Sequence, residues 1–171
     1  MSLIRRSLLI LNSARLAVLA LWFGAALFFS VVVAPAAFGV LRAAGLPNAS
    51  ELAGAIVTRS LSAVNVGGFA IALLLLATLL FVRGPAGRVS LIVEAVGLVV
   101  IALATSLGHW VIAARMRALR AAMVVPIDQV AADDSRRVAF NHLHGYSVNA
   151  LGLAMIVALV LMVLLARNPR Q

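Results

Sequence analysis

Cysteine and lysine are missing from this chain, and acidic residues are scarce. Without cysteine there is no disulfide, no thiolate metal site and no thioether attachment for haem. Only 5 of the 171 residues are acidic, whereas all 14 basic residues are arginine, so the formal net charge is +9. In a soluble protein such an excess suggests nucleic-acid binding. Here the arginines flank apolar runs, so we interpret them as topology signals that touch anionic lipid, and we expect no nucleic-acid partner.

Long apolar runs are what the chain has in abundance. Its residues are 64% hydrophobic and 11% charged, whereas a soluble domain is roughly half apolar and a quarter charged. At about 20 apolar residues for each membrane crossing, the length leaves room for four crossings joined by short connections. We therefore predict an all-α, polytopic membrane protein. It is a single domain over residues 1–171, folded as an antiparallel bundle of four transmembrane helices with no β-sheet.

Four apolar stretches define the predicted spans, and turns with glycine or proline separate them. The turns are Gly45-Leu46-Pro47, Gly84-Pro85 and Val125-Pro126, and the spans cover about residues 16–40, 52–82, 89–114 and 138–165. These stretches exceed the usual span, so we expect the helices to continue past the hydrocarbon. Pro35 removes one backbone hydrogen bond near the end of the first span, which predicts a kink there.

The arginine distribution gives a prediction for topology. Arg5, Arg6 and Arg15 precede the first span, and Arg42 follows it. Positive residues favour the cytoplasmic side, and the first helix usually dominates. We therefore expect both termini to face the cytoplasm, in a bacterial-type inner membrane.

Polar side chains recur at matching depths in the last three spans. Folding the second and third spans about Pro85 sets Ser62 and Asn65 level with His109. Folding the third and fourth about Pro126 sets His109 level with His144. The sequence therefore predicts a polar layer in one leaflet, with these candidate ligand-binding residues: His144, His109, Arg59, Asn149, Asn65 and Ser147.

This layer admits two interpretations. Neutral imidazole is a common metal ligand, and bundle cores host such sites. The layer could thus bind a cation, a metal or a small ligand, with haem or a metal ion as cofactor and His144, His109 and His142 as metal ligands. Alternatively, Ser, Asn and His bond between helices while glycines allow close approach. That pattern suits a structural or assembly subunit in a homodimer or larger membrane complex. The sequence has no phosphate loop, no nucleophile paired with a base and no carboxylate pair, so we expect no enzyme.

Two further residues lie well inside predicted spans. Glu94 is the one acid in such a position, and we consider it either part of a proton or cation relay or a neighbour of Arg88 or Arg83 in the first turns of its helix. Trp22 is expected to be buried and to donate its indole N–H to a neighbour, because that group rarely stays unpaired inside a protein.

Several short motifs resemble the DUF4149 family, the group that includes transmembrane protein 205. They are Leu21-Trp22-Phe23-Gly24 with Val33-Ala34-Pro35-Ala36-Ala37-Phe38, then Ala53-Gly54-Ala55-Ile56-Val57, then Arg117-x-Leu119-Arg120, and finally Arg137-x-x-Phe140-x-x-x-His144-Gly145-x-Ser147. The resemblance implies a four-helix membrane bundle without a settled activity. The pattern is also similar to copper-resistance D-type bundles and to haem-binding four-helix protoporphyrinogen oxidases, and this similarity implies metal or haem binding.

Overall fold

The computed structural model describes residues 3–80 and 88–167, apart from the side chains of residues 3–5 and 8. Its first crossing combines α1 (Leu3–Phe28), the π-helical turn η1 (Phe29–Val33) and α2 (Ala34–Ala43). The helix continues through Pro35, at the start of α2. The departure from α geometry lies just before the proline, where the Ala34 N–H donates to the Phe29 carbonyl, five residues back. A π turn thus stands where the sequence predicts a kink.

The other three crossings follow the same plan of long, nearly continuous helices. They are α3 (Ala49–Leu79), then α4 (Arg88–Ser106) with η2 (Leu107–Ile112) and α5 (Ala113–Ala121), and finally α6 (Ser135–Arg167) after the short η3 (Ile127–Gln129). Within residues 3–80 and 88–167, four helices are long and apolar enough to cross a membrane: Leu9–Ala43, Ala49–Leu79, Arg88–Ala121 and Ser135–Arg167. They contain or overlap the four predicted spans and extend past most of their ends, as expected. The predicted end of the second span, residues 81–82, lies outside the described residues.

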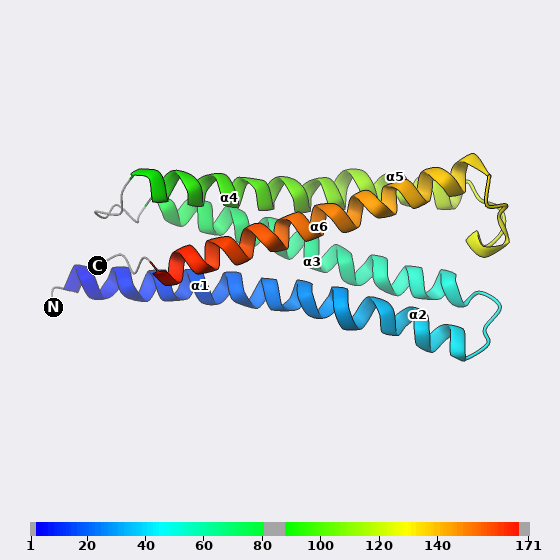
Figure 1. Cartoon of the computed structure of the whole chain (residues 1–171), viewed down its shortest axis with the longest axis horizontal. Coiled ribbons are helices and arrows are strands. Elements are labelled where there is room, and N and C mark those ends of the chain that lie inside the picture. The colour runs from blue at the N-terminus through cyan, green and yellow to red at the C-terminus, as the bar shows by residue number, and fades with distance from the viewer. Residues whose placement is uncertain (1–2, 81–87, 168–171) are drawn as a thin grey trace.

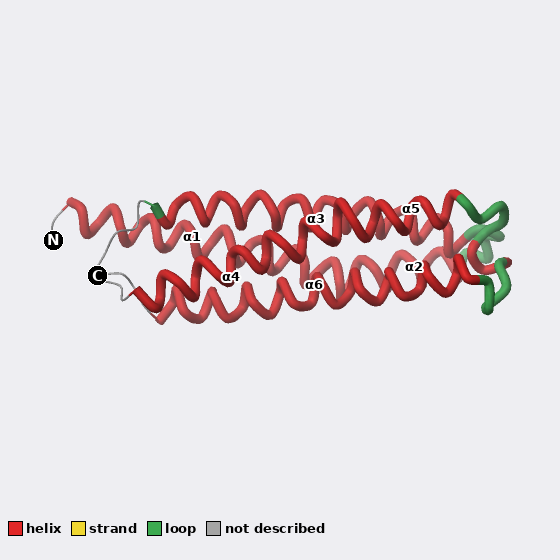
Figure 2. Tube along the Cα trace, turned by 90° about the horizontal axis from the view of Figure 1, so that it is seen from above, coloured by secondary structure: helices red, strands yellow, loops and turns green. Residues whose placement is uncertain are grey.

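The four crossings lie side by side as an elongated bundle, and the two views agree on this (Figures 1 and 2). The start of α1, the end of α3, the start of α4 and the end of α6 share one end (Figure 1). The α2–α3 turn and the α5–α6 connection share the other, so consecutive crossings are antiparallel. No strand occurs among the described residues, which confirms the all-α prediction.

Small residues let the helices approach closely. Ala26, Ala72, Ala154 and Ala158 are fully buried in the core. Trp22 packs against Gly68, where a Cβ would lie 2.7 Å from the indole. Its indole N–H donates to the Val64 carbonyl at 2.9 Å, which confirms the predicted bond. Close packing of this kind holds membrane helices together, because lipid tails are as apolar as the side chains.

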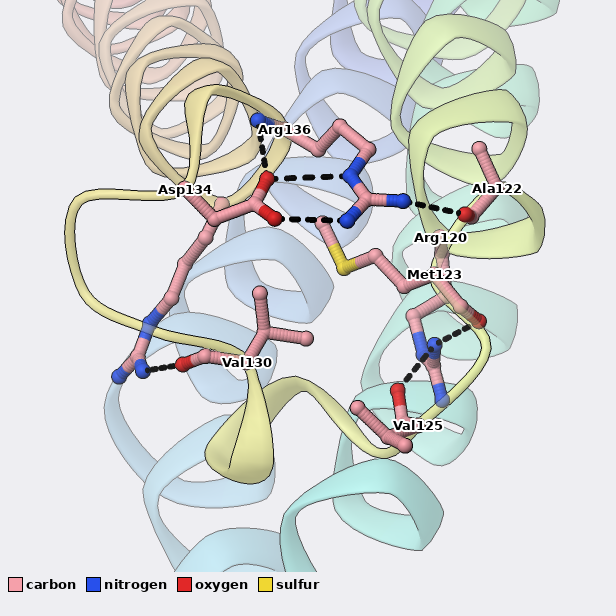
Figure 3. Close-up of polar contacts among 8 residues, drawn as sticks. Arg120, Ala122, Met123, Val125, Val130, Asp134 and Arg136 are labelled. Atoms are coloured by element: carbon pink, nitrogen blue, oxygen red, sulfur yellow. Dashed lines mark hydrogen bonds and ion pairs between the residues drawn. The ribbon is translucent and has the colours of Figure 1, made fainter.

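Arginines organise the α5–α6 connection (Figure 3). Arg120 donates to the carbonyls of Met123 and Val125, and Arg136 donates to the carbonyl of Ala122. Arg136 also binds Asp134, with a shortest N–O distance of 2.6 Å. Hydrogen bonds from the Arg136 side chain and backbone lower the pKa of Asp134 to about 2. The connection is therefore fixed to the ends of both helices that it joins.

Arg120 also forms an ion pair with Glu51 in the first turn of α3. Asn48 is the N-cap of that helix, but its side chain makes no capping hydrogen bond. The Arg120–Glu51 ion pair therefore joins the start of α3 to the end of α5.

Candidate functional site

A polar contact joins α3 to the π-helical turn η2. The Ser62 hydroxyl lies 3.2 Å from Nδ1 of His109, and both residues are half-buried. The Trp110 ring meets the His109 ring edge-on at 4.8 Å and the Phe69 ring edge-on at 5.1 Å. An imidazole and a hydroxyl therefore lie beside an aromatic wall, at the depth that hairpin folding of the sequence predicts.

Asn65 lies one turn deeper on α3 and is enclosed. The residue is 3% exposed. It faces Gly108, where a Cβ would lie 3.1 Å from the amide nitrogen. Polar side chains inside a membrane bundle are costly and tend to mark function. Asn65 thus adds a polar amide beside His109.

The backbone around His109 has an unusual form. Residues Leu107–Ile112 form a π-helical turn, and the Ala113 N–H donates to the Gly108 carbonyl, five residues back. Such turns are rare and often occur at functional sites. Here the turn presents His109 toward Ser62 on α3. We call Ser62, Asn65 and His109 the polar layer from here on.

The predicted contribution of α6 to this layer needs correction. His142, His144 and Asn149 are all exposed, and no hydrogen bond or ring contact between described residues joins His144 to His109. The inward stripe of α6 instead carries residues that pack closely: Ser147, Leu151, Ala154, Ala158, Leu161 and Leu165. Packing of small residues selects the inward face of a membrane helix. His142 and Asn149 lie roughly opposite that stripe.

Ser147 is the α6 candidate that the structure does bury, since its side chain is 8% exposed. Arg59 is exposed on α3, one turn before Ser62. The predicted set of six therefore divides. His109, Asn65 and Ser147 face the bundle, whereas His144, Asn149 and Arg59 face outward.

The metal hypothesis finds no support in this geometry. Among the described residues, no group of three or more His, Cys, Asp or Glu side chains is placed to hold a metal ion. The three histidines that would have formed the site do not converge, because two of them lie on the outer surface of α6. His109 has a hydroxyl and an indole as neighbours.

A second polar site was not predicted from the sequence. Arg15 of α1 and Glu94 of α4 form an ion pair whose side chains are 2% and 6% exposed. Arg15 also donates to the Leu75 carbonyl of α3 at 3.5 Å. The expected neighbour Arg88 is exposed, and Arg83 lies outside the described residues. The true partner comes from the first helix and crosses the bundle.

Asn12 extends this connection to the fourth crossing. Its side-chain nitrogen donates to the Leu165 carbonyl of α6 at 3.3 Å. Asn12 and Arg15 share the buried face of α1 with Leu19, Trp22 and Ala26, at helical spacing. That spacing is the signal that could have identified them, since it sets Arg15 inside the bundle. Charges and amides at this end therefore fix α1 against its three neighbours.

A comparison with known proteins gives one match. The family described as a domain of unknown function, DUF4149, matches residues 17–124, which is more than half of the chain. This stretch contains Asn65, Glu94, Gly108 and His109. No curated protein and no solved structure matches the chain.

Proposed function

This chain belongs to the DUF4149 family, and we propose that it is a non-enzymatic integral membrane protein that binds a small polar ligand in the polar layer. One observation carries the proposal: the π-helical turn η2 brings His109 to 3.2 Å from Ser62, with the buried Asn65 beside them, so three polar side chains gather between α3 and η2. Apolar side chains would pack at these positions without the cost of burying polar groups. A ligand with polar groups of its own would give this layer a use.

The neighbours of Asn65 favour a ligand with both donor and acceptor groups. The imidazole ring of His109 has its Nδ1 beside the Ser62 hydroxyl. When that hydroxyl donates to Nδ1, the proton of the ring lies on Nε2, which becomes a free donor. The other neighbour of His109 is the Trp110 ring, and a hydroxyl, an aromatic ring and a free donor together suit the binding of a polar ligand.

Native mass spectrometry of the protein in a mild detergent tests the proposal. We expect a bound non-protein mass that is lost in His109→Leu and in Asn65→Leu but kept in His142→Leu, whose side chain is exposed on α6. Thermal unfolding of each apo variant shows whether the loss reflects folding. Equal retention of the bound mass in all four proteins, with all of them folded, would contradict ligand binding in this layer.

A structural or assembly role is the second candidate, and the outer face of α6 favours it. This face is shallow and open, and it carries Val138, Asn141, His142, Gly145, Tyr146 and Asn149. Polar groups on the outer face of a membrane helix favour contact with another protein. Gly145→Leu would place a bulky side chain on this face, so a fall in the oligomer mass measured by light scattering would support this role.

The orientation remains part of the proposal. The arginines before the first crossing favour an inner membrane with both termini in the cytoplasm. A reporter fused after Gln171 should then behave as cytoplasmic. Periplasmic behaviour would place the polar layer in the cytoplasmic leaflet instead.

A further inference from the structure

We propose that the ligand of the polar layer is the phosphate-bearing headgroup of an anionic lipid, held at the bundle surface by Arg59. This inference rests on the proposed function and names its ligand. It starts from Arg59, which is exposed inside the crossing Ala49–Leu79. Among the described residues, no ion pair or hydrogen bond holds its guanidinium, whereas Arg15, Arg120 and Arg136 each bind an acid.

Arg59 lies on the same side of α3 as the polar layer. It precedes Ser62 by three residues, and residues three apart are neighbours on a helix surface. Ser62 in turn contacts His109 at 3.2 Å. A single anionic group beside Ser62 would therefore contact both the Arg59 guanidinium of α3 and the His109 imidazole of η2.

The depth of the site fits a lipid headgroup. Trp110 is 51% exposed beside His109, and tryptophan is enriched where the membrane meets water. Along α3, sixteen residues separate Arg59 from Leu75, whose carbonyl accepts from Arg15. At 1.5 Å per residue this is about 24 Å, so most of a hydrocarbon layer of about 30 Å fits between the two arginines. Arg59 therefore lies near one membrane surface, with its layer just below.

The side chains around Arg59 favour a phosphate group as the ligand. Arginine binds phosphate through its planar fork of donors, and basic pockets between membrane helices bind anionic headgroups. The acid of α3, Glu51, already forms an ion pair with Arg120. Phe69 lies deeper on α3, with its ring edge-on to that of Trp110, and offers an apolar surface to an acyl chain. Free inorganic phosphate shares the headgroup chemistry but would make no use of that surface.

Thermal unfolding in detergent with added lipid tests this inference, and competition in native mass spectrometry gives the relative affinities. The probes are phosphatidylglycerol, phosphatidylcholine and inorganic phosphate. We expect phosphatidylglycerol to raise the midpoint and to bind at least tenfold more tightly than phosphatidylcholine. Arg59→Gln should reduce that preference about fivefold, since one arginine near the surface contributes about 1 kcal/mol. Arg117→Gln is the matched control, because Arg117 is also exposed at the same end of the bundle, and it should keep the preference.

Three results would overturn the inference. Equal losses in Arg59→Gln and Arg117→Gln would mean diffuse attraction to charge. Equal stabilisation by inorganic phosphate would make a soluble anion the ligand. A bound mass that His109→Leu removes but Arg59→Gln leaves unchanged would preserve the proposed function and refute the lipid as its ligand. Arg59 is exposed, so its substitution leaves the core intact and each result can be interpreted.

Discussion

Breaking the Arg15–Glu94 pair should destabilise the protein more than removing it altogether. Both side chains are almost completely enclosed, at 2% and 6% exposed. Replacing one partner by an apolar residue leaves the other as an unpaired buried charge, which costs about 3–5 kcal/mol. Replacing both together is often neutral, or stabilising by about 1–4 kcal/mol. The prediction therefore is that the double substitution costs much less stability than either single substitution.

The experiment is a double-mutant cycle with Arg15→Met, Glu94→Leu and the two combined, followed by thermal unfolding in one detergent. At roughly 2–4 °C per kcal/mol for a chain of this size, each single substitution should lower the midpoint by about 6–20 °C. The double variant should recover most of that loss. Arg6→Met is the control, because Arg6 is exposed on the same helix and should have little effect. The reasoning fails if the two single losses simply add in the double variant, since additivity means that the charges are not coupled.

Three further predictions test other contacts. Gly68→Ala should cost about 1–3 kcal/mol, because its Cβ would press on the Trp22 indole at 2.7 Å; Gly67→Ala, where the same ring is 4.0 Å away, should unfold at nearly the wild-type temperature. The guanidinium beside Asp134 holds the pKa of that carboxyl at about 2, below the unfolded value of about 3.9; its stabilising contribution should be complete above about pH 4 and lost toward pH 2, and an NMR titration midpoint near 4 would contradict this. Brominated lipid should quench the half-exposed Trp110 but not Trp22, so Trp110→Phe should abolish most of the quenching; persistent quenching would show that Trp22 reaches lipid.

The bundle and one part of its site could be predicted because they depend on spacing alone. Four long apolar runs separated by turns specify four crossings, and hairpin folding about a turn fixes which residues share a depth. Ser62 and His109 indeed meet, at 3.2 Å. Trp22 donates its indole N–H to a neighbour as expected, and the acceptor is the Val64 carbonyl.

Rotation about the helix axis was not predictable in the same way. Depth sets His144 level with His109, but the direction of each side chain depends on which face of α6 packs inward. The small and apolar stripe from Ser147 through Ala158 decides that, and it turns His142 and Asn149 outward. The buried position of Arg15 was not predicted, for the opposite reason. Its charge suggested a membrane surface, whereas its helical spacing with Leu19 and Trp22 sets it inside.

The two π-helical turns add residues to the first and third crossings beyond what a continuous α-helix would need. In each of them the backbone bond runs from a residue to the one five positions back, so each turn holds one residue more than an α-helical turn. At 3.6 residues per turn, one extra residue rotates everything downstream by about 100°. A relative that lacks the extra residue in Leu107–Ile112 would bring a different side chain to Ser62 while keeping α4 unchanged. Single-residue gaps among relatives should therefore gather at residues 29–33 and 107–112. In this fold, deleting one residue from a π-helical turn would change which side chains face the neighbouring helices along the rest of that crossing.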